Sequence, residues 1–115
     1  MSRAKPGLSL RVILGRGIAF GPGKAELLEH IRDTGSIAAA GRHMKMSYTR
    51  AWSLVEAMNH DFSALLVRSA KGGAKRGGAV LTALGVEVLQ RYRRIQARSA
   101  RVVAAELRAL RGKLR

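Results

Sequence analysis

The chain has 115 residues, and its 22 lysines and arginines against 7 acidic residues give a formal net charge of +15. This length fits a single domain over residues 1–115, and a hydrophobic content of 47% is enough for a packed core. Without cysteine, disulfides and thiolate chemistry are excluded. No run approaches the roughly 18 apolar residues of a membrane span, and the N-terminus has no apolar signal core, so we expect a cytoplasmic protein.

The charge itself points to a partner. A net charge of +15 opposes compaction, and it favours a polyanion such as nucleic acid; the alternative is a solvated basic surface. We expect no membrane partner. Three of the seven acids, Glu26, Glu29 and Asp33, share one stripe of a predicted helix, which we expect to face outward and away from nucleic acid.

The residue pattern of the N-terminal third predicts a strand, a loop and a helix. Apolar residues alternate over Leu8–Leu14 with the period of a strand. The glycine-rich segment 15–23, GRGIAFGPG, predicts a loop, and it does not have the spacing of a Walker phosphate-binding loop. A first helix is predicted from about Gly23 to Thr34, with Gly35 as its stop signal.

Two helices joined by a tight turn are predicted next. Ser36 is a good N-cap for an alanine-rich helix over Ile37–Met44, whose small residues let another helix approach closely. Ser47 caps a further helix over residues 48–60. Its predicted packed face is made of Ala51, Trp52, Val55, Met58 and Phe62. Its predicted open face is made of Thr49, Arg50, Ser53, Ala57 and His60.

The C-terminal half predicts a hairpin and a long helix. Leu65–Ser69 and Ala79–Thr82 are strand candidates around a loop rich in glycine and lysine. Thr82 caps a helix predicted to continue over residues 83–111, about 45 Å long. So small a domain cannot cover its apolar stripe, so we expect pairing with a second copy; the alternative is a frayed basic tail beyond Ala100. The predicted dimer-interface residues are Leu84, Val88, Tyr92, Ile95, Val102, Val103 and Leu107.

This order of elements predicts a mainly α fold with a small β-hairpin wing: a winged helix-turn-helix with a long C-terminal dimerisation helix. In that motif helix 48–60 enters the major groove with its N-terminal residues first, and Arg50 is the candidate for a bidentate guanine contact. The wing, residues 71–78, would contact the backbone or the minor groove. Tyr48 has two open roles, core packing or a phosphate contact. The predicted DNA-contact residues are Ser36, Ser47, Tyr48, Thr49, Arg50, Ser53, Arg68, Lys71, Lys75 and Arg76.

The segment GSIAAAGRHMKMSYTRAWSLVEAMN resembles the DNA-binding domain of ModE-type molybdate-responsive regulators and, more distantly, LysR-type regulators. LLEHIRDTGSI and the LTALGVEVLQRYR after the wing extend the resemblance over roughly residues 8–95. It implies a transcriptional regulator that binds promoter DNA as a homodimer, with the long helix contributing to pairing. ModE proper carries C-terminal molybdate-binding domains. The sequence ends at Arg115, so we expect a one-domain relative without them.

Three alternatives remain beside a sequence-specific regulator. These are a low-specificity nucleoid-type DNA-binding protein, a sensor that binds an oxyanion such as molybdate at the dimer surface, and an adaptor that binds a partner protein through the long helix. No enzyme, cofactor or metal site is expected. The three histidines, His30, His43 and His60, have neither cysteine partners nor HxxxH spacing.

Overall fold

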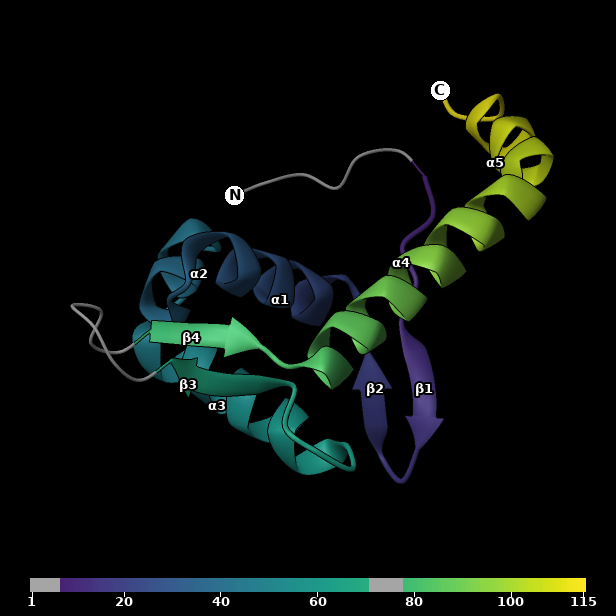
Figure 1. Ribbon diagram of the computed structural model, residues 1–115. Coiled ribbons are helices and arrows are strands. Elements are labelled where there is room, and N and C mark those ends of the chain that lie inside the picture. Colours follow the sequence, from purple (N-terminus) through teal and green to yellow (C-terminus); the bar gives the residue numbers. More distant parts are fainter. Residues whose placement is uncertain (1–6, 71–77) are drawn as a thin grey trace.

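The structure is a computed structural model that describes residues 7–70 and 78–115 (Figure 1). These ranges contain five helices and two antiparallel strand pairs, which confirms the mainly α fold with a two-stranded wing. The strands are β1 (Val12–Gly15), β2 (Ile18–Phe20), β3 (Val67–Ala70) and β4 (Gly78–Leu81). The helices are α1 (Pro22–Thr34), α2 (Ile37–His43), α3 (Tyr48–Asp61), α4 (Ala83–Val102) and α5 (Ala104–Arg111). Within these ranges, no helix has both the length and the apolar character that a membrane crossing requires.

The N-terminal hairpin corrects two expectations. The predicted strand over residues 8–14 is shorter and begins at Val12, and the predicted loop contains a second strand, β2, that pairs with it. Between the strands, Arg16 and Gly17 have φ angles of 55° and 76°. Positive φ at both central residues is what a two-residue type I′ hairpin turn requires. The glycines there signal a turn between strands rather than an irregular loop.

Helix α1 ends where the sequence predicts and forms the centre of the core. Gly35 adopts a left-handed φ of 70°, and its N–H donates to the carbonyl of Ile31 at 2.8 Å. Leu27, Leu28 and Ile31 are fully buried. The helix therefore presents its apolar side to the other elements, as its sequence pattern indicates.

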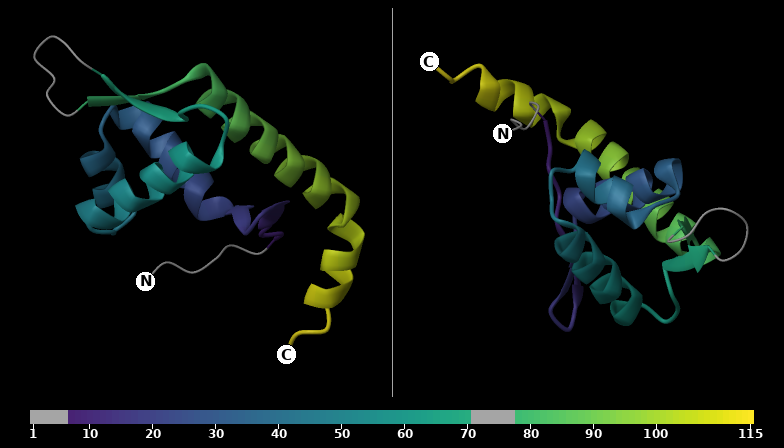
Figure 2. Two further views of the ribbon diagram at one scale, coloured as in Figure 1. Left: turned by 90° about the horizontal axis from the view of Figure 1, so that it is seen from below. Right: turned by 90° about the vertical axis from the view of Figure 1, so that its left-hand side faces the viewer.

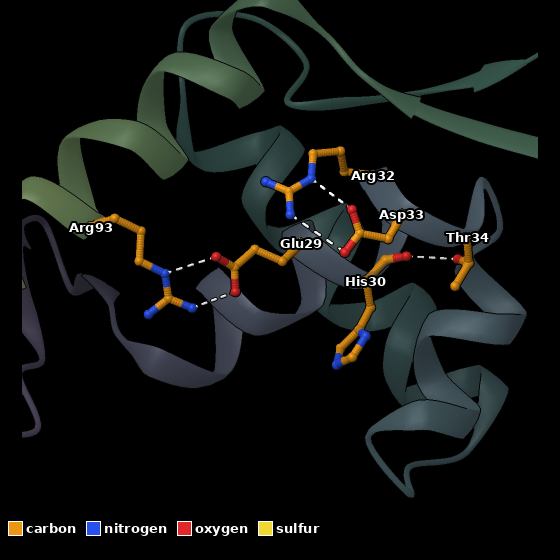
Figure 3. A network of polar contacts seen from close by, with 6 residues as sticks. All are labelled: Glu29, His30, Arg32, Asp33, Thr34 and Arg93. Atoms are coloured by element: carbon orange, nitrogen blue, oxygen red, sulfur yellow. Dashed lines mark hydrogen bonds and ion pairs between the residues drawn. The ribbon is translucent and has the colours of Figure 1, made fainter.

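The acidic side of α1 is only partly turned to solvent. Glu26 and Asp33 are exposed, but Glu29 lies against α4, where Arg93 donates from Nε and Nη2 to its two carboxylate oxygens at 3.0 and 2.5 Å (Figure 3). The two side chains are 30% and 34% exposed. Hydrogen bonding to Glu29 raises the pKa of Arg93. The expectation of a wholly outward acidic stripe is therefore wrong at Glu29, which links α1 to α4.

The predicted single C-terminal helix is two helices. The chain changes direction between α4 and α5 (Figure 2), and Val103 adopts a φ of −98° and a ψ of 6° at the break. Val102 and Val103 are adjacent β-branched residues, which lose side-chain freedom in a helix and so favour an interruption there. Every residue of α5 is exposed or partly exposed.

Tyr92 belongs to the core of its own chain, so its prediction as a dimer-interface residue is wrong. It is 3% exposed, its hydroxyl donates to the carbonyl of Leu10 at 2.6 Å, and its ring meets Phe20 edge to face at 5.2 Å. Leu84 and Val88 are half-buried against the same core. Apolar exposure on α4 is greatest toward its end, where Val102 is 83% exposed, against 43% for Ile95 and 38% for Val86.

Candidate nucleic-acid interface

Helices α2 and α3 are joined by a turn that depends on one glycine. Gly41 is buried, and a Cβ there would lie 3.1 Å from the Cβ of Ala51, so the two helices approach closely at this point. The Gly41 carbonyl accepts the N–H groups of Met44 and Met46 at 3.1 and 3.0 Å. Lys45 takes the left-handed conformation with a φ of 57°. Small residues on α2 therefore permit the helix-turn-helix, as the sequence predicts.

The first turn of α3 is capped and exposed. The Ser47 hydroxyl accepts the N–H of Arg50 at 3.1 Å, as its prediction as an N-cap requires. On the opposite side of the helix Ala51, Val55 and Met58 are buried. The exposed residues of this helix start are Ser47, Tyr48, Thr49, Arg50 and Ser53. The side chains predicted to reach DNA from α3 are thus accessible, which a major-groove role requires.

An exposed ridge continues along α3 beyond the predicted residues. Thr49, Ser53, Glu56 and His60 follow one another at helical spacing, and all are exposed. Glu56 was not among the predicted contacts, although its spacing places it on that ridge. Arg50 places a positive charge beside the start of this ridge, and Glu56 places an acid farther along it. A helix with this charge order would meet phosphates best with its N-terminal end.

The two aromatic residues of α3, Tyr48 and Trp52, lie in different environments. Trp52 is half-buried and packs against the core, which confirms its predicted structural role. Tyr48 is 57% exposed, and its ring meets that of Trp52 edge to face at 6.2 Å. Packing thus positions the Tyr48 ring while much of the side chain remains accessible.

Asn59, near the end of α3, joins this helix to the wing. Its Oδ1 accepts the N–H groups of Leu66 and Val67 at 2.8 and 3.1 Å, and its Nδ2 donates to the Val67 carbonyl at 3.0 Å. Val67 is the first residue of β3, so one side chain fixes α3 relative to the wing. This role of Asn59 was not predicted from the sequence. The one feature that could have indicated it is that this asparagine ends the EAMN segment, which is part of the resemblance to ModE-type regulators.

Several predicted contacts lie on or near the wing. Arg68 is exposed on β3 opposite Val80. The Ser36 hydroxyl accepts the N–H of Ala39 at 3.0 Å as the α2 cap, and Ser36 also forms a β-bridge to Gly78. Its capping role is confirmed, and a DNA contact from Ser36 stays a prediction. The predicted wing residues Lys71, Lys75 and Arg76 lie outside the described residues.

The three histidines do not form a common cluster in the structure. His43 and His60 are exposed, whereas His30 is half-buried, and its ring stacks on that of His43 with centroids 5.2 Å apart. In the part of the chain that the structure describes, no three His, Cys, Asp or Glu side chains are grouped to hold a metal ion.

The chain is similar to proteins named as molybdenum-pterin-binding and as transcriptional regulators. No protein-family model matches it. It is 41% identical over 95 residues to the molybdenum-pterin-binding protein MopB of Rhodobacter capsulatus, covering 82% of this chain and 35% of MopB. It is 39% identical over 71 residues to the DNA-binding transcriptional dual regulator ModE of Escherichia coli K12, covering 62% of this chain and 27% of ModE. The chain spans about a third or less of the length of these relatives, and the resemblance to ModE-type regulators is confirmed.

Solved structures support the fold. The chain is similar to the CbnR DNA-binding domain in a crystal structure with DNA, with a TM-score of 0.60 and 22% identity over 76% of this chain and 95% of that domain. Full-length CbnR complexed with its target DNA gives a TM-score of 0.57 at 21% identity, covering 73% of this chain and 27% of CbnR. The winged helix-turn-helix fold predicted from sequence is therefore confirmed.

Proposed function

We propose that this chain is the DNA-binding unit of a ModE-like transcriptional regulator and binds a specific duplex sequence as a homodimer in the cytoplasm. The observation that carries the proposal is the exposed first turn of α3, directly after a tight turn and capped by Ser47. The relatives support it, because those named as regulators match over this region of the chain. The net charge of +15 supplies the attraction to a polyanion.

In this proposal α3 lies in the major groove, which is about 12 Å wide and admits one helix. Ser47, Thr49 and Ser53 contact base edges and phosphates from its first two turns. Arg50 makes the bidentate guanine contact, worth about 1–3 kcal/mol of discrimination. The wing, with Arg68 on β3 and residues 71–78 at its end, follows the backbone or the minor groove.

The outer part of α4, together with α5, is the proposed dimer seam. Ile95 and Val102 are exposed on α4, and Leu110 is exposed on α5. Val103 and Leu107 are partly buried and also belong to this seam. A seam here, instead of along all of residues 83–111, is consistent with the burial of Tyr92 in its own chain. Two α3 helices would then address half-sites about 34 Å apart.

Two other activities are supported by particular observations. The charge of +15 also suits a nucleoid-type protein with little sequence preference. The names of the relatives make an oxyanion such as molybdate a candidate effector at the dimer surface. Calorimetry with molybdate, tungstate and sulfate tests the second possibility.

The deciding experiment selects genomic fragments that the chain retains and then measures binding to selected and random duplexes at one fixed salt concentration. We expect a clear preference for the selected fragments. Arg50→Ala should reduce that preference about 5- to 150-fold, the equivalent of one bidentate contact. Arg94→Ala, at an exposed position of α4 off the stripe of Ile95 and Val102, is the matched control. Equal binding to selected and random DNA by the unmodified chain would support the nucleoid-type activity instead.

A further inference from the structure

Three basic side chains from separate parts of the chain line one open pocket beside the start of α3. Arg11 immediately precedes β1, Lys24 is in the first turn of α1, and Arg50 is in the first turn of α3. The pocket has a volume of about 330 Å³, and Met46 and Leu54 are among the other residues that line it. The fold creates this cluster, because Arg11 and Arg50 are far apart in the sequence.

No carboxylate neutralises this cluster within the described residues. None of the residues that line the pocket is acidic. The ion pairs of the described ranges join Arg32 to Asp33, Arg91 to Glu87 and Arg93 to Glu29, so the three pocket cations take part in none of them. Three positive charges around one hollow repel one another unless an anion lies between them.

Lys24 is also held in place. Its Nζ donates to the carbonyl of Ala19 at 2.6 Å, which fixes the ammonium group at the wall of the pocket. An ammonium group has three donors, so two remain for an anion. Arg11 is exposed, and its guanidinium group supplies further donors of the type that binds phosphate bidentately. Arg50, also exposed, adds its positive charge at the side of the pocket that faces α3.

We infer that this pocket binds a backbone phosphate of the DNA duplex at the edge of the groove that α3 enters. The inference rests on the proposed function and deepens it by adding Arg11 and Lys24 to the DNA-binding surface. Arg50 joins the pocket to the exposed ridge of α3, so a duplex engaged by that ridge brings its backbone to the pocket. Phosphate contacts commonly make up half or more of the hydrogen bonds in such complexes.

The test replaces Arg11 and Lys24, which line the pocket but do not belong to α3. Arg11→Gln, Lys24→Gln and the double variant are compared with the unmodified chain, and Arg94→Gln on α4, off the stripe of Ile95 and Val102, serves as the control for loss of a positive charge. Affinity is measured over a series of salt concentrations for a selected fragment and for a random duplex of equal length. Losing one phosphate contact should make the dependence of log K on log salt shallower by about one unit per bound protomer. The change should be the same for both duplexes, since phosphates carry no sequence information.

A slope for the double variant that matches that of Arg94→Gln would overturn the inference. Thermal unfolding of each variant checks its folding. If the loss of the Lys24–Ala19 hydrogen bond unfolds the chain, the salt-dependence slope of Arg11→Gln alone tests the inference. Calorimetry with inorganic phosphate separates a duplex site from a small-anion site. Phosphate binding that the double variant loses, with unchanged DNA slopes, assigns the pocket to a free anion and overturns the duplex assignment.

These outcomes are distinguishable from failure of the proposed function. If the unmodified chain shows no preference for selected fragments but the double variant still has the shallower slope, the pocket stands and sequence-specific regulation fails. If the preference is present and the slopes are unchanged, only the pocket fails. If the unmodified chain binds no duplex at all, both are wrong.

Discussion

Gly85, in the first turn of α4, lies directly against the peptide group of Leu66. A Cβ added at Gly85 would overlap the Leu66 carbonyl oxygen and would lie 3.0 Å from its carbonyl carbon. The same oxygen accepts the backbone N–H of Thr82 at 2.9 Å. Because Leu66 immediately precedes β3, this contact determines how closely the wing approaches α4.

Gly85→Ala should destabilise the protein, although alanine favours helix by about 1 kcal/mol over glycine. The clash is with backbone rather than a flexible side chain, so we expect a net loss of about 1–3 kcal/mol in the free energy of unfolding. The matched control is Gly23→Ala in the first turn of α1, where no atom lies within 4 Å of an added Cβ. Urea unfolding of both variants measures the difference. Equal stability of the two would show that the contact with Leu66 relaxes without cost.

Asn59→Ala should weaken the connection between α3 and the wing. It removes the acceptor of two N–H groups and the donor to the Val67 carbonyl, so we expect a loss of about 1–3 kcal/mol. Hydrogen exchange gives the specific readout: the amides of Leu66 and Val67 should exchange faster. Asn59→Asp, which keeps the accepting oxygen, should retain more of that protection. Unchanged exchange in Asn59→Ala would assign the positioning of the wing to other contacts.

The stability of the protein should fall in alkaline solution through Tyr92. Burial raises the pKa of this hydroxyl above its ordinary value of 10.0, so above that pH the folded chain holds the proton more tightly than the unfolded chain. This contribution is fully present below pH 10.0 and is lost as the pH rises through the folded-state pKa.

Tyr92→Phe tests this linkage. At neutral pH the variant should lose about 1 kcal/mol with the hydrogen bond to Leu10, and above pH 10.0 its stability should fall less steeply than that of the unmodified chain. Chemical unfolding at a series of pH values from 8 to 11 gives both quantities. Tyr48→Phe, at an exposed position, is the control for the loss of a tyrosine hydroxyl. Parallel curves for Tyr92→Phe and the unmodified chain would remove Tyr92 as the cause.

Val102→Asp should raise the monomer fraction. Val102 is 83% exposed on the outer part of α4, and a carboxylate buried in a seam would cost several times more than the apolar contact it replaces. Analytical ultracentrifugation over a range of protein concentrations measures the equilibrium. Ala97→Asp introduces the same charge at an exposed position on another side of α4 and should change little. Equal dimer strength in both variants would place the seam elsewhere.

Features that depend on neighbouring residues were predicted well from the sequence. Ser36, Ser47 and Thr82 cap their helices, and Gly35 ends α1 in a left-handed conformation, because each signal acts within about one turn of helix. The exposed side of α3 followed equally from helical spacing, except that Glu56 was left out.

Features that depend on contacts between distant segments were not predicted. Periodicity places Tyr92 on an apolar stripe, but it does not tell whether that stripe packs on its own chain or on a second copy. The pairing of β2 with β1, the bond between Glu29 and Arg93, and the pocket around Arg11 and Lys24 all join segments that only the folded chain brings together. The interruption at Val103 was missed because a continuous apolar stripe masked two adjacent poor helix formers.

The eight residues of α5 offer a spectroscopic test of the proposed self-association. A helix this short is only marginally formed in water by itself, and its partial burial within one chain contributes little to holding it. If the proposed seam forms, contact with a second copy should add to the stability of α5. Circular dichroism should accordingly show helical content rising with protein concentration, and a chain truncated after Val103 should lose that concentration dependence while its core stays folded.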